Sequence, residues 1–156
     1  MKILLVIQKN CEYSQKAYEH LKKFNFEIKL IYSQKRFEPF PKEISNWEGD
    51  YLFSLFNYII FPKNFLQKVK FPINFHPSTP NHAGSGMINW ALYNNDEFFG
   101  STAHLISEDI DNGKILKVNR FQIKKNDSIE SLGIKTKEIC LKLFCEITEE
   151  LFIKKK

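Results

Sequence analysis

The first predicted strand limits the fold more than any other feature of the sequence. Residues 3–7 form an unbroken apolar run, Ile-Leu-Leu-Val-Ile, between Lys2 and Gln8. A strand that is apolar at every position has both faces buried, which is typical of a parallel sheet covered on both sides. At 156 residues the chain is long enough for one such domain with a full core. We therefore predict a single α/β domain over residues 1–156.

The rest of the chain alternates between helix-like and strand-like segments. Periodicity predicts helices over 14–24, 62–68, 86–94 and from Asp127 onward, and strands over 26–32, 51–56, 71–75, 101–107 and 114–123. A short helix near 43–47 interrupts an otherwise irregular loop. This order predicts an open, twisted, mostly parallel sheet.

The last helix has both a start signal and an apolar stripe. Asp127 followed three residues later by Glu130 is the pattern of a capping box. The residues expected on its buried face are Leu132, Ile139, Leu143, Ile147 and Leu151.

Composition and motifs exclude several functional classes. No apolar run reaches the roughly 18 residues of a membrane helix, and the opening segment turns polar too soon for a signal peptide. The three cysteines form neither a disulfide framework nor a CxxC metal pair. No glycine-rich loop follows the first strand, which argues against a nucleotide cofactor held in that way. We expect a cytoplasmic protein with no metal and no membrane partner.

The net charge of +5 raises the question of a nucleic-acid partner. Residues 74–113 contain five acidic residues and no Lys or Arg, so the positive charge is spread over the remainder. Scattered lysines are usually solvated, whereas a positive rim around a polar pocket attracts small anions. We therefore expect no nucleic-acid partner.

A polar, histidine-bearing segment follows directly on the predicted strand over 71–75. Asn74 and His76 are two residues apart and project from the same face, with Phe75 turned into the core. They stand at the carboxyl end of a strand, where open sheets bind ligands. An amide beside an imidazole suits an oxyanion, and Asp111 in the turn before Gly113 would favour the imidazolium. The residues alone leave open a purely structural histidine with Asn74 as a strand-end cap.

Four short motifs in this order resemble the folate-dependent formyltransferases. The similarity spans roughly residues 50–145. The matching stretches are Asn74-Phe75-His76-Pro77-Ser78, Pro80 with Gly84, Gly100-Ser101-Thr102-Ala103-His104, and Asp111-Asn112-Gly113. The resemblance implies a Rossmann-like fold, shortened in its N-terminal half, and an enzyme that transfers a formyl group from 10-formyltetrahydrofolate to a primary amine.

The resemblance also implies roles for the catalytic residues. Asn74 and a protonated His76 would stabilise the oxyanion of the tetrahedral intermediate. Asp111 would keep His76 charged and help to move the proton from the amine to the departing folate nitrogen. His104 would support Asp111 from behind, with a structural role as the alternative.

Binding residues follow from the same resemblance. The pterin would lie between the segment Asn57, Tyr58, Ile59, Ile60 and the backbone of Ser107, Glu108 and Asp109. Ser78 and Thr79 would line or support the substrate site. For His82 we expect a surface position, with contact to the acceptor as the alternative.

Two departures from the family bear on the acceptor. The short turn over 76–84, with Gly49-Asp50-Tyr51-Leu52, looks like the sugar N-formyltransferases, which implies an amino sugar on a nucleoside diphosphate. The glycine-rich phosphate loop of glycinamide ribonucleotide enzymes is absent at Gln8-Lys9-Asn10-Cys11. We also expect no C-terminal accessory domain, which disfavours a methionyl-tRNA acceptor.

The alternatives are glycinamide ribonucleotide as acceptor and, in another class, an inactive folate-binding or scaffold remnant of the fold. The Phe-rich composition and the short chain are also compatible with a homodimer.

Overall fold

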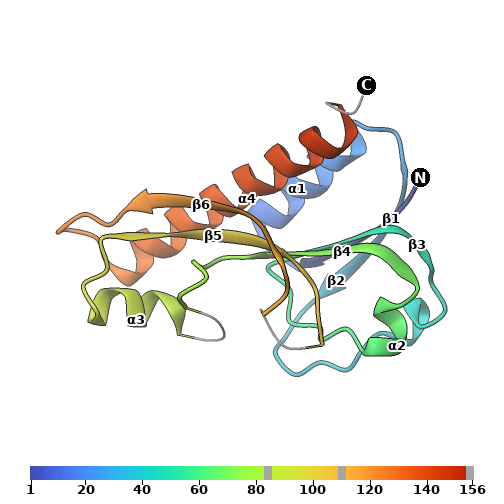
Figure 1. Cartoon of the computed structure of the whole chain (residues 1–156), viewed down its shortest axis with the longest axis horizontal. Helices are drawn as coiled ribbons and strands as arrows, with labels where there is room; N and C mark the ends of the chain where they lie inside the picture. Colours follow the sequence, from blue (N-terminus) through green and yellow to red (C-terminus); the bar gives the residue numbers. More distant parts are fainter. Residues whose placement is uncertain (83–85, 109–111, 154–156) are drawn as a thin grey trace.

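The structure is a computed structural model that describes residues 1–82, 86–108 and 112–153. In that part of the chain a six-stranded sheet has the order β2-β1-β3-β4-β5-β6 (Figure 1). The strands are β1 (Lys2–Gln8), β2 (Glu27–Ser33), β3 (Gly49–Leu55), β4 (Val69–His76), β5 (Phe98–Leu105) and β6 (Ile115–Gln122). The helices are α1 (Glu12–Lys22), the 3₁₀ helix η1 (Lys42–Ile44), α2 (Lys63–Leu66), α3 (Met87–Tyr93) and α4 (Ile129–Phe152).

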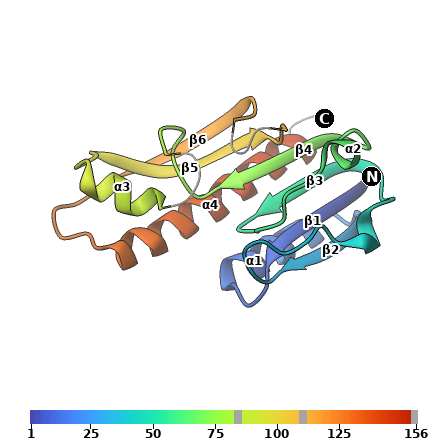
Figure 2. The ribbon, with the colours of Figure 1, turned by 90° about the horizontal axis from the view of Figure 1, so that it is seen from below.

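The strand pairing changes from parallel to antiparallel after β4. Strands β2, β1, β3 and β4 are parallel to one another, β5 is antiparallel to β4, and β6 is antiparallel to β5. Figure 2 shows the strands side by side with α4 crossing behind them. The open, mostly parallel sheet that the sequence predicts is therefore confirmed.

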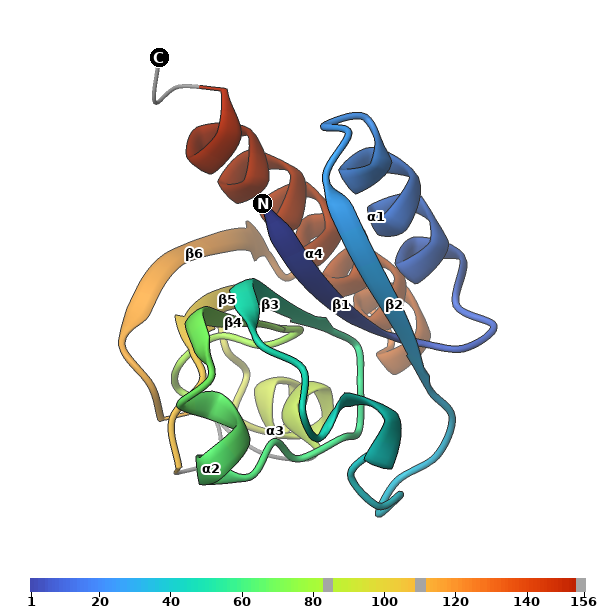
Figure 3. The ribbon, with the colours of Figure 1, turned by 90° about the vertical axis from the view of Figure 1, so that its right-hand side faces the viewer.

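The two faces of the sheet are covered differently (Figure 3). Helices α1 and α4 pack against one, which we call the helix face. Helices η1 and α2 and the loop over 56–62 cover the other, which we call the loop face. Ile3, Leu5 and Ile7 point to the helix face and Leu4 and Val6 to the loop face, and all five are fully buried. The apolar run is thus buried on both sides, as predicted.

The edge strand β2, which overlaps the strand predicted over 26–32, is covered unevenly by the two layers. Ile28 and Leu30 are half-buried as expected for an apolar row, but Tyr32 is 42 % exposed. Ile31 and Ser33 are buried instead, because the loop face covers the end of this strand more fully than the helix face does.

The cap of α4 lies one residue later than predicted. Ser128 is the N-cap: its Oγ accepts a hydrogen bond from the Ser131 backbone N–H at 3.2 Å. The Ser131 hydroxyl in turn accepts from the Ser128 N–H at 2.9 Å. The prediction that Asp127 and Glu130 form the box was wrong, because serine at both positions supplies the two reciprocal acceptors.

The buried stripe of α4 is also rotated from the predicted one. Leu132, Leu143 and Ile147 are buried as expected. Ile139 and Leu151 are only partly buried, whereas Cys140 and Phe144 are completely buried. The rotation follows the aromatic core, because Phe144 meets Phe75 edge-on with ring centroids 5.0 Å apart.

The cysteines are all free thiols. Burial raises the pKa of Cys140 to about 12 and that of Cys145 to about 11. A thiol with so high a pKa is an inert packing group at neutral pH. No helix among the described residues is long and apolar enough to cross a membrane.

The stabilising effect of Asp127 at the start of α4 should depend on pH. Its carboxylate accepts from Lys135 Nζ at 2.6 Å and from the Lys124 N–H at 2.8 Å, which lower its pKa from 3.8 to about 2. A carboxyl with a depressed folded-state pKa stabilises the fold above its unfolded pKa and loses this effect as pH falls through the folded one. We expect Asp127→Asn to reduce the free energy of unfolding near pH 6.

The difference between wild type and Asp127→Asn should shrink between pH 4 and pH 2. Urea unfolding at a series of pH values measures it, with Glu130→Gln as the control. A pH-independent difference would contradict this assignment of Asp127.

Candidate active site

The strand register sets three polar side chains in one row across the loop face. Asn74 on β4 is paired with Ser54 on β3 and with His104 on β5. Phe75 is fully buried on the helix face, so alternation turns Asn74 and His76 to the loop face together. The structure thus brings Asn74 and His76 side by side, as the sequence predicts.

Asn74 is held by hydrogen bonds on both sides. The Ser54 hydroxyl donates to its Oδ1 at 2.7 Å, and its Nδ2 lies 3.2 Å from Nε2 of His104. His104 is 3 % exposed, and its Nδ1 lies 2.9 Å from the Leu105 carbonyl oxygen. Among the described residues, then, His104 supports Asn74.

His76 is the last residue of β4, and its backbone carbonyl is held by two hydrogen bonds. Its carbonyl accepts from the Ser78 N–H at 2.8 Å and from the Ser101 hydroxyl at 2.9 Å. Its ring stands edge-on to that of His104, with centroids 6.5 Å apart. The predicted partner Asp111 and the predicted folate contact Asp109 lie outside the described residues.

The loop after β4 is braced from inside by Ser78 and Thr79, which are both buried. The Ser78 hydroxyl donates to the His82 carbonyl at 2.9 Å, and the His82 N–H donates to the Thr79 carbonyl at 3.1 Å. The Thr102 hydroxyl donates to the Ser78 carbonyl at 2.7 Å. In this structure Ser78 and Thr79 support the site from within the fold.

His82 is partly buried and its side chain is mostly enclosed, so the expectation of a surface histidine was wrong. Only 10 % of its side chain is exposed, its Nε2 meets Oδ2 of Asp96, and its ring packs against Phe99. Asp96 is fixed in turn because its N–H donates to the Ala91 carbonyl at the end of α3. The His82–Asp96 contact therefore ties the site loop to the junction of α3 and β5.

The predicted folate segment begins with a turn of left-handed backbone. Phe56 has φ 53°, so the chain folds back as it leaves β3. The Nδ2 of Asn57 then donates to the Ser54 hydroxyl, while its Oδ1 accepts from the Ile59 N–H at 2.6 Å. Asn57 thus points inward and joins its own loop to the row of polar residues.

The next residues of this segment divide between core and surface. Ile59 is 6 % exposed and belongs to the loop-face core, whereas Ile60 is 67 % exposed. The Tyr58 N–H donates to the Ser33 hydroxyl at 2.9 Å, and its hydroxyl accepts from Gln8 at 3.1 Å. The loop is therefore anchored to the carboxyl ends of β1 and β2.

The opposite predicted folate wall begins after β5. Ser107 and Glu108 are exposed, and Glu108 pairs with Lys63 at 2.5 Å. Lys63 is the first residue of α2, just after the segment over 57–60. This pair links the two predicted walls, although an exposed ion pair adds little stability.

Comparison with known proteins identifies the family. The family described as formyl transferase matches residues 8–148. The chain belongs to the formyl transferase family. GDP-perosamine N-formyltransferase of Brucella melitensis is 29 % identical over 97 residues, 61 % of this chain and 38 % of that protein.

Solved structures share the fold. An N-formyltransferase from Helicobacter canadensis, crystallised with folinic acid and dTDP-3-aminofucose, gives a TM-score of 0.79 at 20 % identity, covering 97 % of this chain and 64 % of that one. Phosphoribosylglycinamide formyltransferase from Streptococcus pneumoniae gives 0.72 at 17 % identity, covering 97 % and 98 %.

Gly113, the last residue of the family motif, occupies a position that has room only for glycine. A Cβ on Gly113 would lie 1.7 Å from the Leu105 carbonyl oxygen and 3.4 Å from Nδ1 of His104. Only glycine allows the chain to pass this close. Glycine at this position therefore leaves the Leu105 carbonyl oxygen free of a steric clash, so that it can bond to Nδ1 of His104.

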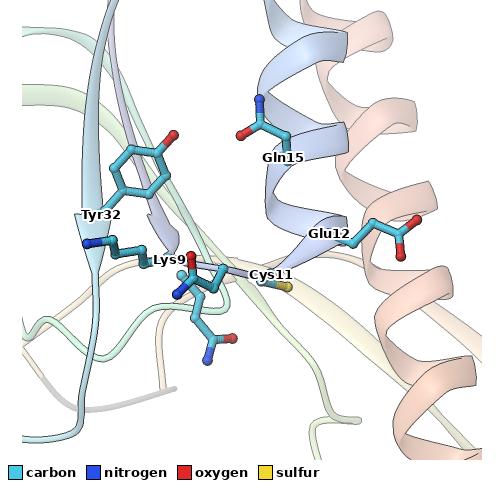
Figure 4. A pocket seen from close by; sticks show the side chains of 7 residues that line it. Lys9, Cys11, Glu12, Gln15 and Tyr32 are labelled. Carbon is cyan, nitrogen blue, oxygen red and sulfur yellow. The ribbon is translucent and has the colours of Figure 1, made fainter.

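A polar hollow of about 460 Å³ lies at the same edge of the sheet as the family site. Tyr32 on β2 lies opposite Gln15 on α1 across it (Figure 4). The lining residues are Gln8, Lys9, Asn10, Cys11, Glu12, Gln15 and Tyr32. Gln8 joins this hollow to the predicted folate loop through its bond to Tyr58.

Ser54 is the residue of the polar row that the sequence did not single out, whereas Asn57 was predicted as a folate contact and its side chain instead bonds to Ser54 and to the Ile59 N–H. The available signal was a serine inside the apolar run over 51–56 of a central strand. A buried hydroxyl at such a position needs partners, but their identity depends on the neighbouring strand. Among the described residues, no group of three or more His, Cys, Asp or Glu side chains gathers as a metal site would.

We expect the His82–Asp96 contact to stabilise the family fold measurably. A double-mutant cycle with His82→Ala and Asp96→Ala should give a coupling of about 1–3 kcal/mol in the free energy of unfolding, because the histidine is largely buried. The exposed Lys63–Glu108 pair is the control and should show no measurable coupling. Additive effects of His82→Ala and Asp96→Ala would contradict the expectation.

Proposed function

We propose that this chain transfers a formyl group from 10-formyltetrahydrofolate to the amine of an amino sugar carried on a nucleoside diphosphate. One observation carries the proposal: Asn74 and His76 project together from the carboxyl end of β4, with the Asn74 amide held between Ser54 and His104. An amide and an imidazole so placed provide two donors for one oxyanion.

The chemistry follows from these two donors. The neutral amine of the acceptor attacks the formyl carbon, and the carbonyl oxygen becomes an oxyanion in the tetrahedral intermediate. Asn74 Nδ2 and the protonated ring of His76 donate to that oxyanion. As the bond from carbon to N10 of the folate breaks, the attacking nitrogen loses a proton and N10 gains one. In this proposal Asp111 keeps His76 protonated and relays the proton.

The folate would enter between the two exposed segments that flank the polar row. Ile60 offers an exposed apolar side chain on one of them, and Ser107 and Glu108 are exposed on the other. The hydrogen bonds of Asn57 and Tyr58 and the burial of Ile59 keep the first segment in place. This arrangement suits a flat heterocycle held mainly through backbone groups.

A nucleotide-linked amino sugar is the acceptor that the similarities favour. The family members similar to this chain include an enzyme named for GDP-perosamine and one crystallised with dTDP-3-aminofucose. The polar hollow beside β1 would receive part of such an acceptor, with Lys9 and Tyr32 as its contacts.

Glycinamide ribonucleotide is the second candidate because phosphoribosylglycinamide formyltransferase from Streptococcus pneumoniae shares this fold. Against it, the segment Gln8-Lys9-Asn10-Cys11 contains no glycine to cradle a phosphate. A third possibility, an inactive folate-binding remnant, predicts folate binding without turnover.

Turnover of 10-formyltetrahydrofolate with a panel of amines separates these candidates. We expect the protein to formylate at least one aminated sugar nucleotide and not to formylate glycinamide ribonucleotide. Mass spectrometry of the product detects the added formyl group. Faster formylation of glycinamide ribonucleotide would favour the second candidate. If the protein binds folate but consumes no 10-formyltetrahydrofolate with any of the amines, the enzyme function is contradicted.

We expect Asn74→Ala to lower kcat about a hundredfold, corresponding to about 3 kcal/mol of lost transition-state stabilisation. His76→Ala should lower kcat at least as much, and Asp111→Ala should also lower it strongly. The melting temperature of each variant checks that the fold is retained, and Ile134→Ala on the exposed side of α4 is the control. A near-normal kcat for both Asn74→Ala and His76→Ala would refute the assigned roles.

A further inference from the structure

A chain of hydrogen bonds crosses the loop face and ends on the backbone at both sides. It runs from the Ile59 N–H to Asn57, then through Ser54, Asn74 and His104 to the Leu105 carbonyl. A backbone N–H is always a donor and a carbonyl always an acceptor. The two ends therefore fix the direction of every bond between them.

The direction can be followed from the Ile59 end. Its N–H must donate, so the oxygen of Asn57 faces it and the nitrogen of Asn57 faces Ser54. The Ser54 hydroxyl then accepts from Asn57, and its single proton is left to donate to Asn74. The oxygen of the Asn74 amide is thus turned to Ser54 and its nitrogen to His104.

The Leu105 end of the hydrogen-bond chain independently requires the same orientation of the Asn74 amide. The Leu105 carbonyl accepts only from a protonated Nδ1 of His104. In the neutral ring with its proton on Nδ1, Nε2 is an acceptor, which requires a donor from Asn74. If the Asn74 amide were flipped, its oxygen would face the Nε2 lone pair and the Ser54 proton would lose its acceptor.

We propose that Ser54 and Asn57 are positioning residues that set the orientation of the Asn74 amide from the backbone of the folate loop. This inference rests on the proposed function, because Asn74 is the donor to the oxyanion there. Ser54 is 2 % exposed, so water does not readily replace its hydroxyl. Its loss removes the bond that the Asn74 oxygen accepts and the bond that the Asn57 nitrogen donates, and with them the link from the loop over 56–62 to the Asn74 amide.

The proposal predicts a loss of rate that depends on Asn74. We expect Ser54→Ala to lower kcat about tenfold with little change in the acceptor KM, and Ser54→Thr, which retains the hydroxyl, to recover most of the rate. In an Asn74→Ala background, Ser54→Ala should change kcat less than about twofold. Thr136→Val, which removes a buried hydroxyl from α4, is the matched control and should leave kcat unchanged.

A measurement on the resting protein distinguishes this inference from the proposed function. The side-chain amide signals of Asn74, identified by their loss in Asn74→Ala, should shift and exchange faster with solvent in Ser54→Ala and in Asn57→Ala, but not in Thr136→Val. If no amine is formylated and these signals still respond, the proposed function fails and the positioning role stands. Unmoved amide signals, or an equal rate loss with and without Asn74, would overturn the inference.

Discussion

Burial of Phe75 is the constraint on which the site depends. Its ring meets Phe144 of α4 and Phe53 of β3 with centroids 5.0 and 6.1 Å apart, and it is completely buried. Because side chains alternate along a strand, an aromatic anchored on the helix face forces Asn74 and His76 onto the loop face. A shift of β4 by one residue would reverse both, so core packing and site geometry are specified by the same register.

The antiparallel direction of β5 gives the end of β4 a support that a parallel neighbour would not. From its pairing with Asn74, β5 runs past the end of β4 alongside the loop that follows it. Ser101 and Thr102, side by side on β5, donate to the carbonyls of His76 and Ser78. The last residue of β4 and the start of the following loop are therefore both bonded to β5, which holds the end of β4, with Asn74 and His76, in place.

The sequence predicts the parts of this structure that depend on one segment at a time. The apolar run over 3–7 indicated the sheet, and the alternation around Phe75 predicted which side chains project together. The predictions that failed depend on partners from distant segments. The His82 side chain is turned inward because Asp96 lies beside it, and α4 is rotated because Phe144 fits the aromatic core. The role of Ser54 depends on its register with β4, which no single-strand pattern contains.

The same reasoning explains why the loop over 56–62 holds a strained conformation. A left-handed backbone at Phe56 costs about 1 kcal/mol or more, and such a residue persists only where its surroundings over-determine it. Asn57 provides this by bonding forward to Ile59 and back to Ser54, and the Tyr58 N–H adds a third bond to Ser33. Each of these bonds exists only if the chain turns back at Phe56. The turn that shapes the loop and the hydrogen bonds that orient Asn74 therefore stabilise one another, and neither forms in isolation.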